Sequence, residues 1–208
     1  MLIISITDAA ADSDAIARAA DIVRGGGVVA YATDTLYGLA VDPRSDAAVA
    51  RLFAVKGRDE GEPIPLIAAS LEQARAVGAF GDTELRLAHS FWPGPLTIVV
   101  PALPGLSSRV LAGGKTVAVR VPAHEIARTL AGALDHAVTS TSANRSGVAP
   151  PTSVAEIGPA LASGLDAIVD SGPAPGGPPS TIVKVVGARV ELVRAGAIAW
   201  DRVLESLE

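Results

Sequence analysis

Residues 13–32, SDAIARAADIVRGGGVVAYA, place a helical pattern directly before a strand pattern. The first twelve of these residues carry apolar side chains at helical spacing, and Asp12 or Ser13 is the expected N-cap. Gly25 is expected to end the helix, because glycine readily adopts the backbone conformation that follows a helix C-terminus. The residues from 27 to 32 are a short apolar run typical of a buried strand. This order predicts a domain that combines helices and strands around one core.

The same alternation continues over the rest of the chain. Further strands are expected at 2–6, 64–69, 96–101, 116–121, 137–141, 167–170, 181–186 and 190–194, and further helices at 46–55, 71–77, 83–91, 125–131 and 199–207. Strands interleaved with helices predict a layered α/β domain with a central sheet. The last two strands meet at Gly187 and Ala188 and are expected to form a hairpin, so the sheet should be mixed.

Composition limits the classes of protein to which this chain can belong. Hydrophobic residues make up 49% of it and charged residues 19%, which is enough apolar side chain for a sizeable core. The chain has no cysteine, so disulfides, thiolate metal sites and a cysteine nucleophile are excluded. A net charge of −5 argues against non-specific coating of nucleic acid. No apolar run approaches the ~18 residues of a membrane-spanning helix, so we expect a cytoplasmic protein with no membrane association.

Polar residues follow the predicted strand 27–32 without a break. Thr33, Asp34 and Thr35 stand where the strand ends, and strand ends are where ligands bind in α/β sheets. Two hydroxyls and a carboxylate could hold the polar groups of an amino acid. Taken alone, however, the segment is better explained as a turn closed by an aspartate hydrogen bond.

Three arginine and lysine side chains are candidates for binding an anion. Lys56 and Arg58 follow the predicted helix 46–55 with one glycine between them, so both could face a phosphate; a solvated basic helix end is the alternative. Arg120 lies inside the strand 116–121, where a charge must be paired or must face a ligand. The residues leave an internal salt bridge and a bound carboxylate equally open for Arg120.

Hydroxyl groups gather at the ends of two later strands. In residues 139–147, TSTSANRSG, the four hydroxyls of 139–142 are followed by Asn144, Ser146 and available backbone amides, a set suited to phosphate contacts or to a plain polar loop. The Gly-x-x-x-x-Gly-Lys spacing of a Walker A loop is absent. Ser180 follows the Pro/Gly-rich segment 171–179, which we expect to be a mobile loop over a site. The three histidines are widely spaced in the sequence, and we expect no metal site made by the protein.

In this order the segments closely resemble the YrdC/YciO-like family. The matching stretches are YATDTLYGLAVDP at 31–43, KGR at 56–58, FWPGPLTIVV at 91–100, VAVRVPAH at 117–124, TSANRSG at 141–147, STIV at 180–183 and LVRAGAI at 192–198. The Lys-x-Arg and Ser-x-Asn pair is the most specific part. The resemblance implies a twisted, open mixed sheet flanked by helices, with a large concave groove. It implies one domain over 1–208, of the short type without an additional C-terminal domain.

The resemblance also implies an activity. Members of the family are L-threonylcarbamoyladenylate synthases, nucleotidyltransferases that form threonylcarbamoyl-AMP and pyrophosphate from L-threonine, bicarbonate or CO2, and ATP. Mg²⁺ would bind through the triphosphate. The product serves threonylcarbamoyladenosine modification of tRNA, so downstream threonylcarbamoyl-transferase proteins are expected partners. Contact between tRNA and a basic groove is a further expectation.

Site residues carry over from the family by motif. The residues expected to bind L-threonine are Thr35, Arg120, Ser140 and Ser180. The residues expected to bind ATP are Lys56, Arg58, Thr116, Ser142, Asn144, Pro150 and Arg194. Lys56 and Arg58 are also the expected catalytic residues, because they would offset the charge of the reacting phosphates.

Four positions depart from the family pattern. Ala32 and Asp59 stand where proline is usual or common, and Glu62 stands where asparagine or another polar ATP contact is frequent. A carboxylate beside a triphosphate is unfavourable unless a cation intervenes. Ile67 lies near a histidine position that longer relatives use for threonine. The resemblance therefore assigns no role to Glu62 or Ile67.

Two other functions stay open at this point. A non-catalytic RNA-binding member of the family would keep the fold and the groove but would lack ATP turnover. A carbamoyl-transfer accessory domain, as in hydrogenase-maturation proteins, would accompany zinc-finger and acylphosphatase-like modules, and this chain has no cysteine for a finger. The motif residues at 56, 58, 142 and 144 favour the enzyme.

Overall fold

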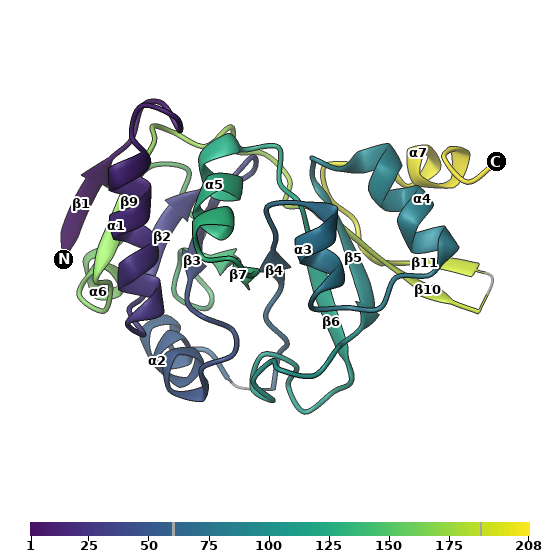
Figure 1. The fold of residues 1–208 in the computed structure, drawn as a ribbon, viewed down its shortest axis with the longest axis horizontal. Coiled ribbons are helices and arrows are strands. Elements are labelled where there is room, and N and C mark those ends of the chain that lie inside the picture. The colour runs from purple at the N-terminus through teal and green to yellow at the C-terminus, as the bar shows by residue number, and fades with distance from the viewer. Residues whose placement is uncertain (60, 188) are drawn as a thin grey trace.

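The computed structural model describes residues 1–59, 61–187 and 189–208, and their strands form two mixed sheets that lie side by side (Figure 1). The first sheet has the order β1-β9-β2-β3-β8. Its strands are β1 (Leu2–Ser5), β2 (Val29–Ala32), β3 (Tyr37–Ala40), β8 (Thr141–Ser142) and β9 (Ala167–Asp170). In this sheet β9 runs parallel to both β1 and β2, whereas β3 is antiparallel to its neighbours β2 and β8.

The second sheet has the order β11-β10-β5-β6-β4-β7. Its strands are β4 (Leu66–Ile67), β5 (Leu96–Pro101), β6 (Thr116–Arg120), β7 (Val138–Thr139), β10 (Thr181–Val186) and β11 (Arg189–Arg194). β10 and β11 pair antiparallel, as the sequence predicts for a hairpin. The turn position Ala188 lies outside the described residues. The mixed character that the sequence predicts is confirmed in both sheets.

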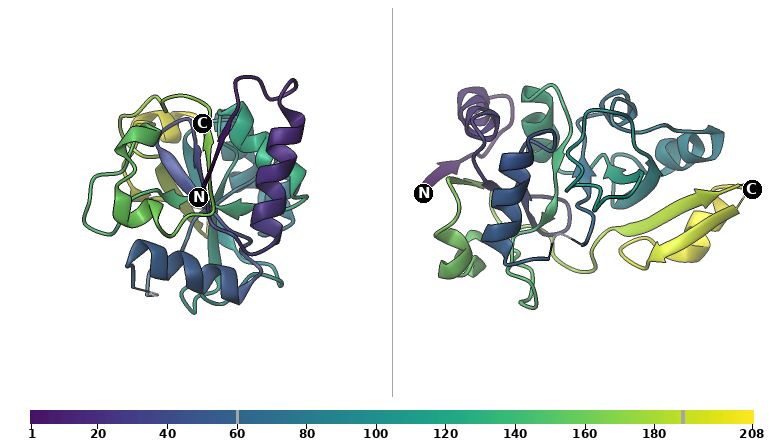
Figure 2. Two further views of the ribbon diagram at one scale, coloured as in Figure 1. Left: turned by 90° about the vertical axis from the view of Figure 1, so that its left-hand side faces the viewer. Right: turned by 90° about the horizontal axis from the view of Figure 1, so that it is seen from below.

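Helices flank the two sheets on both faces (Figure 2). They are α1 (Ser13–Arg24), α2 (Asp46–Lys56), α3 (Leu71–Arg75), α4 (Asp82–Phe91), α5 (Glu125–Ala133), α6 (Pro159–Ala162) and α7 (Trp200–Glu205), with a short 3-10 turn at Val154–Glu156. α1, α5 and α4 lie on one face, and α6 and α7 lie on the other (Figure 2). None of the helices in the described part of the chain is long and apolar enough to cross a membrane.

The chain passes from one sheet to the other at Ser140. β7 pairs with β4 in the second sheet, and β8 pairs with β3 in the first. The sequence predicts one strand over 137–141 in one central sheet, and this is where the structure differs. Side-chain bonds add to the backbone bonds at the junction. The Thr139 hydroxyl donates to the carbonyl of Leu39 (2.8 Å) and accepts from the amide of Val41 (2.9 Å), and the Thr139 amide donates to the carbonyl of Val41 (3.3 Å). Side-chain hydroxyls can therefore satisfy backbone groups where the chain leaves one sheet and enters the other.

Strand β3 lies in the core and was not predicted from the sequence. All four residues of β3 are buried, yet the sequence predicts no strand there. Its letters Tyr-Gly-Leu-Ala show no alternation, because both faces of the strand are covered. Tyr31 and Tyr37 are the largest fully buried side chains. One cluster of buried residues includes members of both sheets, so the sheets share a hydrophobic core.

Candidate functional site

The segment that follows β2 is a tight turn into β3. The Thr33 hydroxyl donates to the carbonyl of Leu36 (2.7 Å) and lies 3.1 Å from the Thr35 hydroxyl. Both threonines are buried. The sequence predicts a turn closed by the aspartate, and the structure corrects this detail. Thr33 closes the turn, which leaves the carboxylate of Asp34 to point toward another element.

Asp34 forms a buried ion pair with Arg120. The Nη1 atom of Arg120 lies 2.5 Å from Oδ1 of Asp34, and the two side chains are 7% and 11% exposed. The second carboxylate oxygen accepts from the amide of Ala123 at 3.0 Å. The internal salt bridge that the sequence left open for Arg120 is therefore present. It also joins the turn after β2 in the first sheet to the end of β6 in the second.

A second arginine stands near the first. Nη2 of Arg194 donates to the carbonyl of Ser180 (2.8 Å) and lies 3.2 Å from its hydroxyl. The same hydroxyl lies 2.8 Å from Oγ1 of Thr97. Partial burial and, to a smaller degree, the nearby Arg120 lower the pKa of Arg194. Two neighbouring guanidinium groups repel each other, so an anion between them would be attracted to both.

Ser140 interacts with Tyr31, which lies near Arg120. The buried Tyr31 hydroxyl donates to the carbonyl of Thr139 at 3.1 Å, and it also interacts with the Ser140 side chain. Burial raises the pKa of Tyr31, while Ser140 and the nearby Arg120 oppose that shift. A Cβ atom at Gly38 would lie 3.4 Å from Oγ of Ser140, so the glycine leaves room for this close approach.

The four residues expected to bind threonine are therefore brought together. They come from the turn after β2, from the end of β6, from the junction between the sheets and from the start of β10. The contacts of Thr33, Tyr31 and Arg194 described above connect them. The result is a cluster of hydroxyls and two guanidinium groups where the two sheets meet, suited to a small zwitterion.

Lys56 and Arg58 stand at the C-terminus of α2. Ser45 caps the start of this helix by accepting from the amide of Ala48 (3.3 Å). Gly57 ends it in the left-handed conformation, with φ of 56°. Glycine is favoured at this position, because L side chains rarely adopt a φ in this range. Lys56, before the glycine, is buried, and Arg58, after it, contacts Thr141 at the start of the 141–147 loop.

The ammonium group of Lys56 is buried against the backbone of the 141–147 loop. It donates to the carbonyl of Ser142 and, at 2.8 Å, to the carbonyl of Asn144. Burial and the neighbouring Arg58 lower the pKa of Lys56 to about 8. The side chain is 3% exposed. In this state Lys56 holds the loop in shape rather than facing solvent.

Arg58 lies closer to the surface and has a carboxylate partner. Its Nη1 donates to the hydroxyl of Thr141 (3.0 Å), and its Nη2 donates to the carbonyl of Pro63 (3.3 Å). Nη2 also lies 2.8 Å from Oε2 of Glu62. The Nε atom of Arg58 is buried and has no hydrogen-bond partner within the described residues.

The other residues expected to bind ATP are spread more widely. Ser142 and Asn144 lie beside Lys56, and Oδ1 of Asn144 is a buried acceptor with no partner in the described part of the chain. Thr116 is exposed at the opposite end of β6 from Arg120. The two positions are four residues apart, roughly 13 Å along a strand. Pro150 is exposed after the 141–147 loop. These residues do not form one cluster, and only an extended ligand could contact all of them.

Comparison with known proteins gives the family. Residues 21–196 match the model of the Sua5/YciO/YrdC family, which carries the description "Telomere recombination". The chain belongs to the Sua5/YciO/YrdC family. The threonylcarbamoyl-AMP synthase of Halorhodospira halophila is 43% identical over 155 residues, which are 74% of this chain and 81% of that protein.

Solved structures of the Sua5/YciO/YrdC family share the fold over almost the whole chain. Pyrococcus abyssi Sua5 complexed with L-threonine has a TM-score of 0.92 and 32% sequence identity, covering 100% of this chain and 61% of that one. E. coli YciO has a TM-score of 0.82 and 26% identity, covering 94% of both chains. The mixed α/β fold predicted from the sequence is confirmed by these likenesses.

The loop 171–179 packs against the first family motif. The amide of Gly176 donates to the carbonyl of Thr35 at 2.9 Å, and the Tyr37 hydroxyl donates to the carbonyl of Gly172 at 2.7 Å. The amide of Ala174 donates to the carbonyl of Thr152 at 2.7 Å. The loop therefore lies beside the candidate site, where the sequence predicts it.

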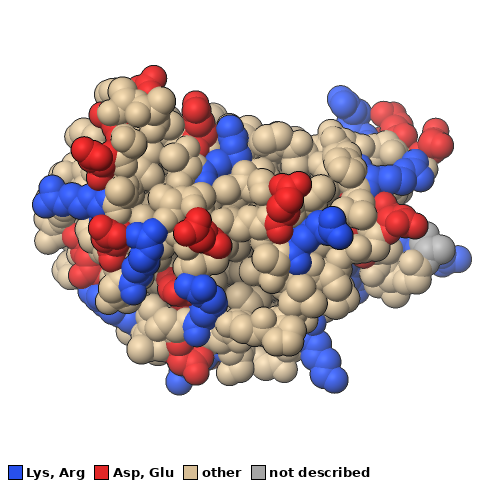
Figure 3. Space-filling view, in the orientation of Figure 1, with Lys and Arg blue, Asp and Glu red and all other residues tan. Residues whose placement is uncertain are grey.

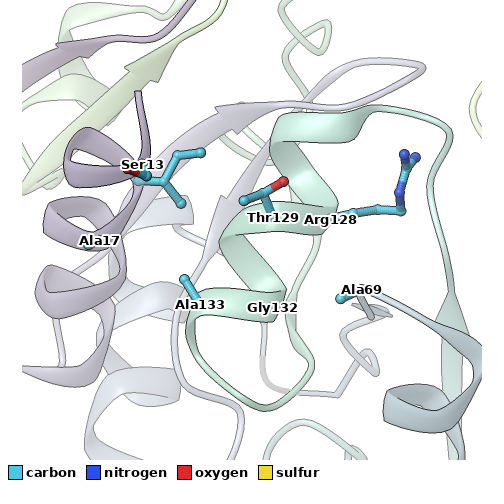
Figure 4. A pocket seen from close by; sticks show the side chains of 8 residues that line it. Ser13, Ala17, Ala69, Arg128, Thr129, Gly132 and Ala133 are labelled. Carbon is cyan, nitrogen blue, oxygen red and sulfur yellow. The ribbon is translucent and has the colours of Figure 1, made fainter. Parts of the chain in front are cut away.

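Two cavities lie apart from the residues expected to bind threonine and ATP. One of about 440 Å³ opens between α1 and α5, where Ser13, Thr129 and Ala133 line it (Figure 4). Another of about 220 Å³ is lined by residues that include Gln73 and His136. Neither is lined by a residue expected to bind L-threonine or ATP. The large concave groove stays a prediction.

The electrostatic surroundings set two further limits. Within the described residues, no group of three or more histidine, aspartate and glutamate side chains could hold a metal ion. Figure 3 shows acidic and basic side chains interspersed over one face of the molecule. This face therefore has no large region of a single charge to attract a nucleic acid.

The structure adds three residues to those that the sequence analysis assigned to substrate binding. Asp34 adjoins Thr35 in the family motif, and the need to pair a buried arginine could have identified it. Thr97 and Tyr31 lie in strands that read as ordinary core. Only the packing of β5 against β10 brings Thr97 to Ser180.

Proposed function

We propose that this protein is an L-threonylcarbamoyladenylate synthase, a nucleotidyltransferase that forms threonylcarbamoyl-AMP and pyrophosphate from L-threonine, bicarbonate or CO2, and ATP. The observation that carries the proposal is the proximity of Arg120 and Arg194 to the expected hydroxyls. Thr35 is linked to Arg120 through Thr33, Ser140 interacts with Tyr31 near Arg120, and Ser180 contacts Arg194. The relatives named threonylcarbamoyl-AMP synthase support the reaction, and the Sua5 structure with L-threonine supports the amino acid.

L-Threonine would bind where the two sheets meet. The carboxylate would contact Arg120, whose five N–H groups exceed the two that contact Asp34 and Thr33. The nearby Arg194 would add a second positive charge. The hydroxyls of Thr35, Ser140 and Ser180 would contact the amine and the hydroxyl of the substrate. Contacts from several directions would favour threonine over serine or glycine, which lack its methyl group or its whole side chain.

ATP would extend from this cluster along the 141–147 loop. Arg58 and Arg194 would offset the charge of the phosphates, with Ser142 and Asn144 as hydrogen-bonding groups. Lys56 would act through the backbone of the loop as well as through its charge. Thr116 and Pro150 would contact more distant parts of the nucleotide. Mg²⁺, for which the described residues provide no cluster of ligands, would be held by the triphosphate and supply further charge neutralisation.

The reaction needs no covalent intermediate with the protein. The threonine amine loses a proton and forms an N–C bond to CO2, or to bicarbonate with loss of water, which gives a carbamate. A carbamate oxygen attacks the α-phosphorus of ATP, the bond to the β-phosphate oxygen breaks, and pyrophosphate leaves. The protein would contribute position and charge, because holding the carbamate in line with the α-phosphate replaces a rare encounter in solution.

The product defines the wider role that we propose. Threonylcarbamoyl-AMP would serve threonylcarbamoyladenosine formation in tRNA, in the cytoplasm. Downstream threonylcarbamoyl-transferase proteins would take the activated group. The interspersed charges of Figure 3 favour transfer by such proteins over direct contact between this face and tRNA.

Pyrophosphate release from ATP tests the proposed function. We expect release by the purified protein only when L-threonine and bicarbonate are both present, and a marked loss when serine or glycine replaces threonine. The Arg120→Ala variant should lose threonine affinity. A folded protein that releases no pyrophosphate under these conditions would refute the synthase activity and favour the RNA-binding function.

A further inference from the structure

Glu62 occupies the outward edge of Arg58. The carboxylate lies 2.8 Å from Nη2, and its side chain is 72% exposed while that of Arg58 is 17% exposed. The other described contacts of the guanidinium are hydrogen bonds to the Thr141 hydroxyl and to the Pro63 carbonyl. An anionic ligand that approaches Arg58 from solvent would therefore meet the carboxylate of Glu62 at Nη2, the donor that the ligand would need.

The remaining donors of Arg58 do not offer an equal alternative. Nε is buried and has no partner in the described part of the chain, so an anion could reach it only if the segment around it moved. Nη1 is engaged by the Thr141 hydroxyl. Nη2 contacts the carboxylate of Glu62, whose side chain is 72% exposed, so it is the donor that lies on the solvent side of the guanidinium.

We propose that Glu62 is an affinity-setting residue that competes with the nucleotide phosphates for Arg58. The proposal rests on the assignment of Arg58 to nucleotide binding in the proposed function. An exposed ion pair contributes little free energy, so a phosphate can displace the carboxylate. The displaced carboxylate stays close to the phosphates and repels them. Both effects weaken the binding of ATP and pyrophosphate, and the second hastens release of the product pyrophosphate.

The competition discriminates among ligands by their charge. Inorganic pyrophosphate and ATP carry several negative charges, so both should feel the carboxylate. Adenosine carries none and should bind independently of residue 62. Added salt screens exposed charges, so the difference between the native protein and a neutral variant should shrink as salt rises.

The Glu62→Gln variant tests the proposal, because glutamine keeps the size of the side chain and removes its charge. We expect ATP and pyrophosphate, measured by titration calorimetry at low salt, to bind about three- to tenfold more tightly. Dissociation of pyrophosphate should slow by a similar factor. Asp59→Asn is the matched control, since it removes the same charge from a neighbouring residue and leaves the Glu62–Arg58 contact in place.

The outcomes separate this inference from the proposed function. Native protein that binds ATP and pyrophosphate no less tightly than Glu62→Gln would overturn the competition and leave the synthase proposal standing. An equal gain in Asp59→Asn would also overturn it, because the effect would then be one of net charge. If neither ligand binds to any variant, the assignment of Arg58 fails and both proposals fall together.

Discussion

Two arginine–carboxylate pairs of this molecule have opposite surroundings. Arg120 and Asp34 are both buried, and they join the turn after β2 to the end of β6 across the two sheets. Arg58 and Glu62 are four residues apart in one segment, and the glutamate is 72% exposed. The distances, 2.5 Å and 2.8 Å, differ little. Burial and connectivity therefore separate the two pairs more than geometry does.

The difference in burial suits the two ion pairs to different functions. A buried pair is costly to break, because removal of one partner leaves an uncompensated charge in a medium of low dielectric constant. An exposed pair exchanges its partner for water or for a ligand at little cost. The first pair suits a fixed site for a small substrate, and the second suits a site whose occupant changes during each turnover.

The largest expected effect is on the buried pair. Replacing Asp34 with asparagine keeps the shape of the side chain but leaves Arg120 without its counter-charge. We expect a loss of about 3–5 kcal/mol in the free energy of unfolding, measured by denaturant titration, and weaker L-threonine binding. The control is Asp21→Asn, which breaks the exposed Arg24–Asp21 pair and should cost at most about 1 kcal/mol. Equal losses in the two variants would contradict the distinction.

A smaller effect should appear at Lys56, as a dependence of stability on pH. Burial lowers the pKa of Lys56 to about 8 in the folded protein, from its ordinary value of 10.5. Between these values the unfolded chain keeps a proton that the folded protein has released, so rising pH favours folding over this window. We expect a gain of at most roughly 3 kcal/mol between about pH 8 and pH 10.

The Lys56→Met variant isolates this contribution. Denaturant titrations of both proteins at several pH values should show a rise for the native protein that is missing in the variant. The variant should also be less stable at neutral pH if the two loop carbonyls that it leaves unpaired outweigh the relief of a buried charge. Parallel pH profiles for the two proteins would refute the assignment.

An intermediate effect is expected at Tyr37, a fully buried side chain that makes a neutral hydrogen bond. Replacing it with phenylalanine removes the hydroxyl that donates to the carbonyl of Gly172 at 2.7 Å. We expect a loss of about 1 kcal/mol in stability and faster hydrogen exchange at the amides of the 171–179 loop. The amide of Ala30, in the β2–β3 ladder, serves as an internal control and should keep its protection relative to global unfolding.

The smallest effect is expected at the exposed pair. Glu62→Gln should change the free energy of unfolding by less than about 1 kcal/mol, even though it changes nucleotide affinity. Thermal and denaturant unfolding measure the first quantity, and calorimetric titration measures the second. A large loss of stability would place Glu62 among the structural residues and would remove the contrast between the two pairs.

The sequence determined most of the elements and indicated which residues to expect in the site. Residues 96–101, 167–170 and 181–186 were predicted as strands with the bounds that the structure gives, because β-branched runs between turn residues leave little choice. The motifs also indicated Thr35, Arg120, Ser140 and Ser180 together, and these residues do meet. Their roles toward threonine and ATP remain predictions.

Only the tertiary structure decided how the strands are divided and which charges are paired. The sequence predicts one strand over 137–141, but the chain changes sheet at Ser140, and the Thr139 hydroxyl bonds to the backbone of Leu39 and Val41 at this junction. β3 was missed, because a strand covered on both faces shows no alternation. The partner of Arg120 lies 86 residues away in the chain, on the turn after β2. Local sequence sets propensity and pattern, whereas pairing of distant groups depends on the packing of whole sheets.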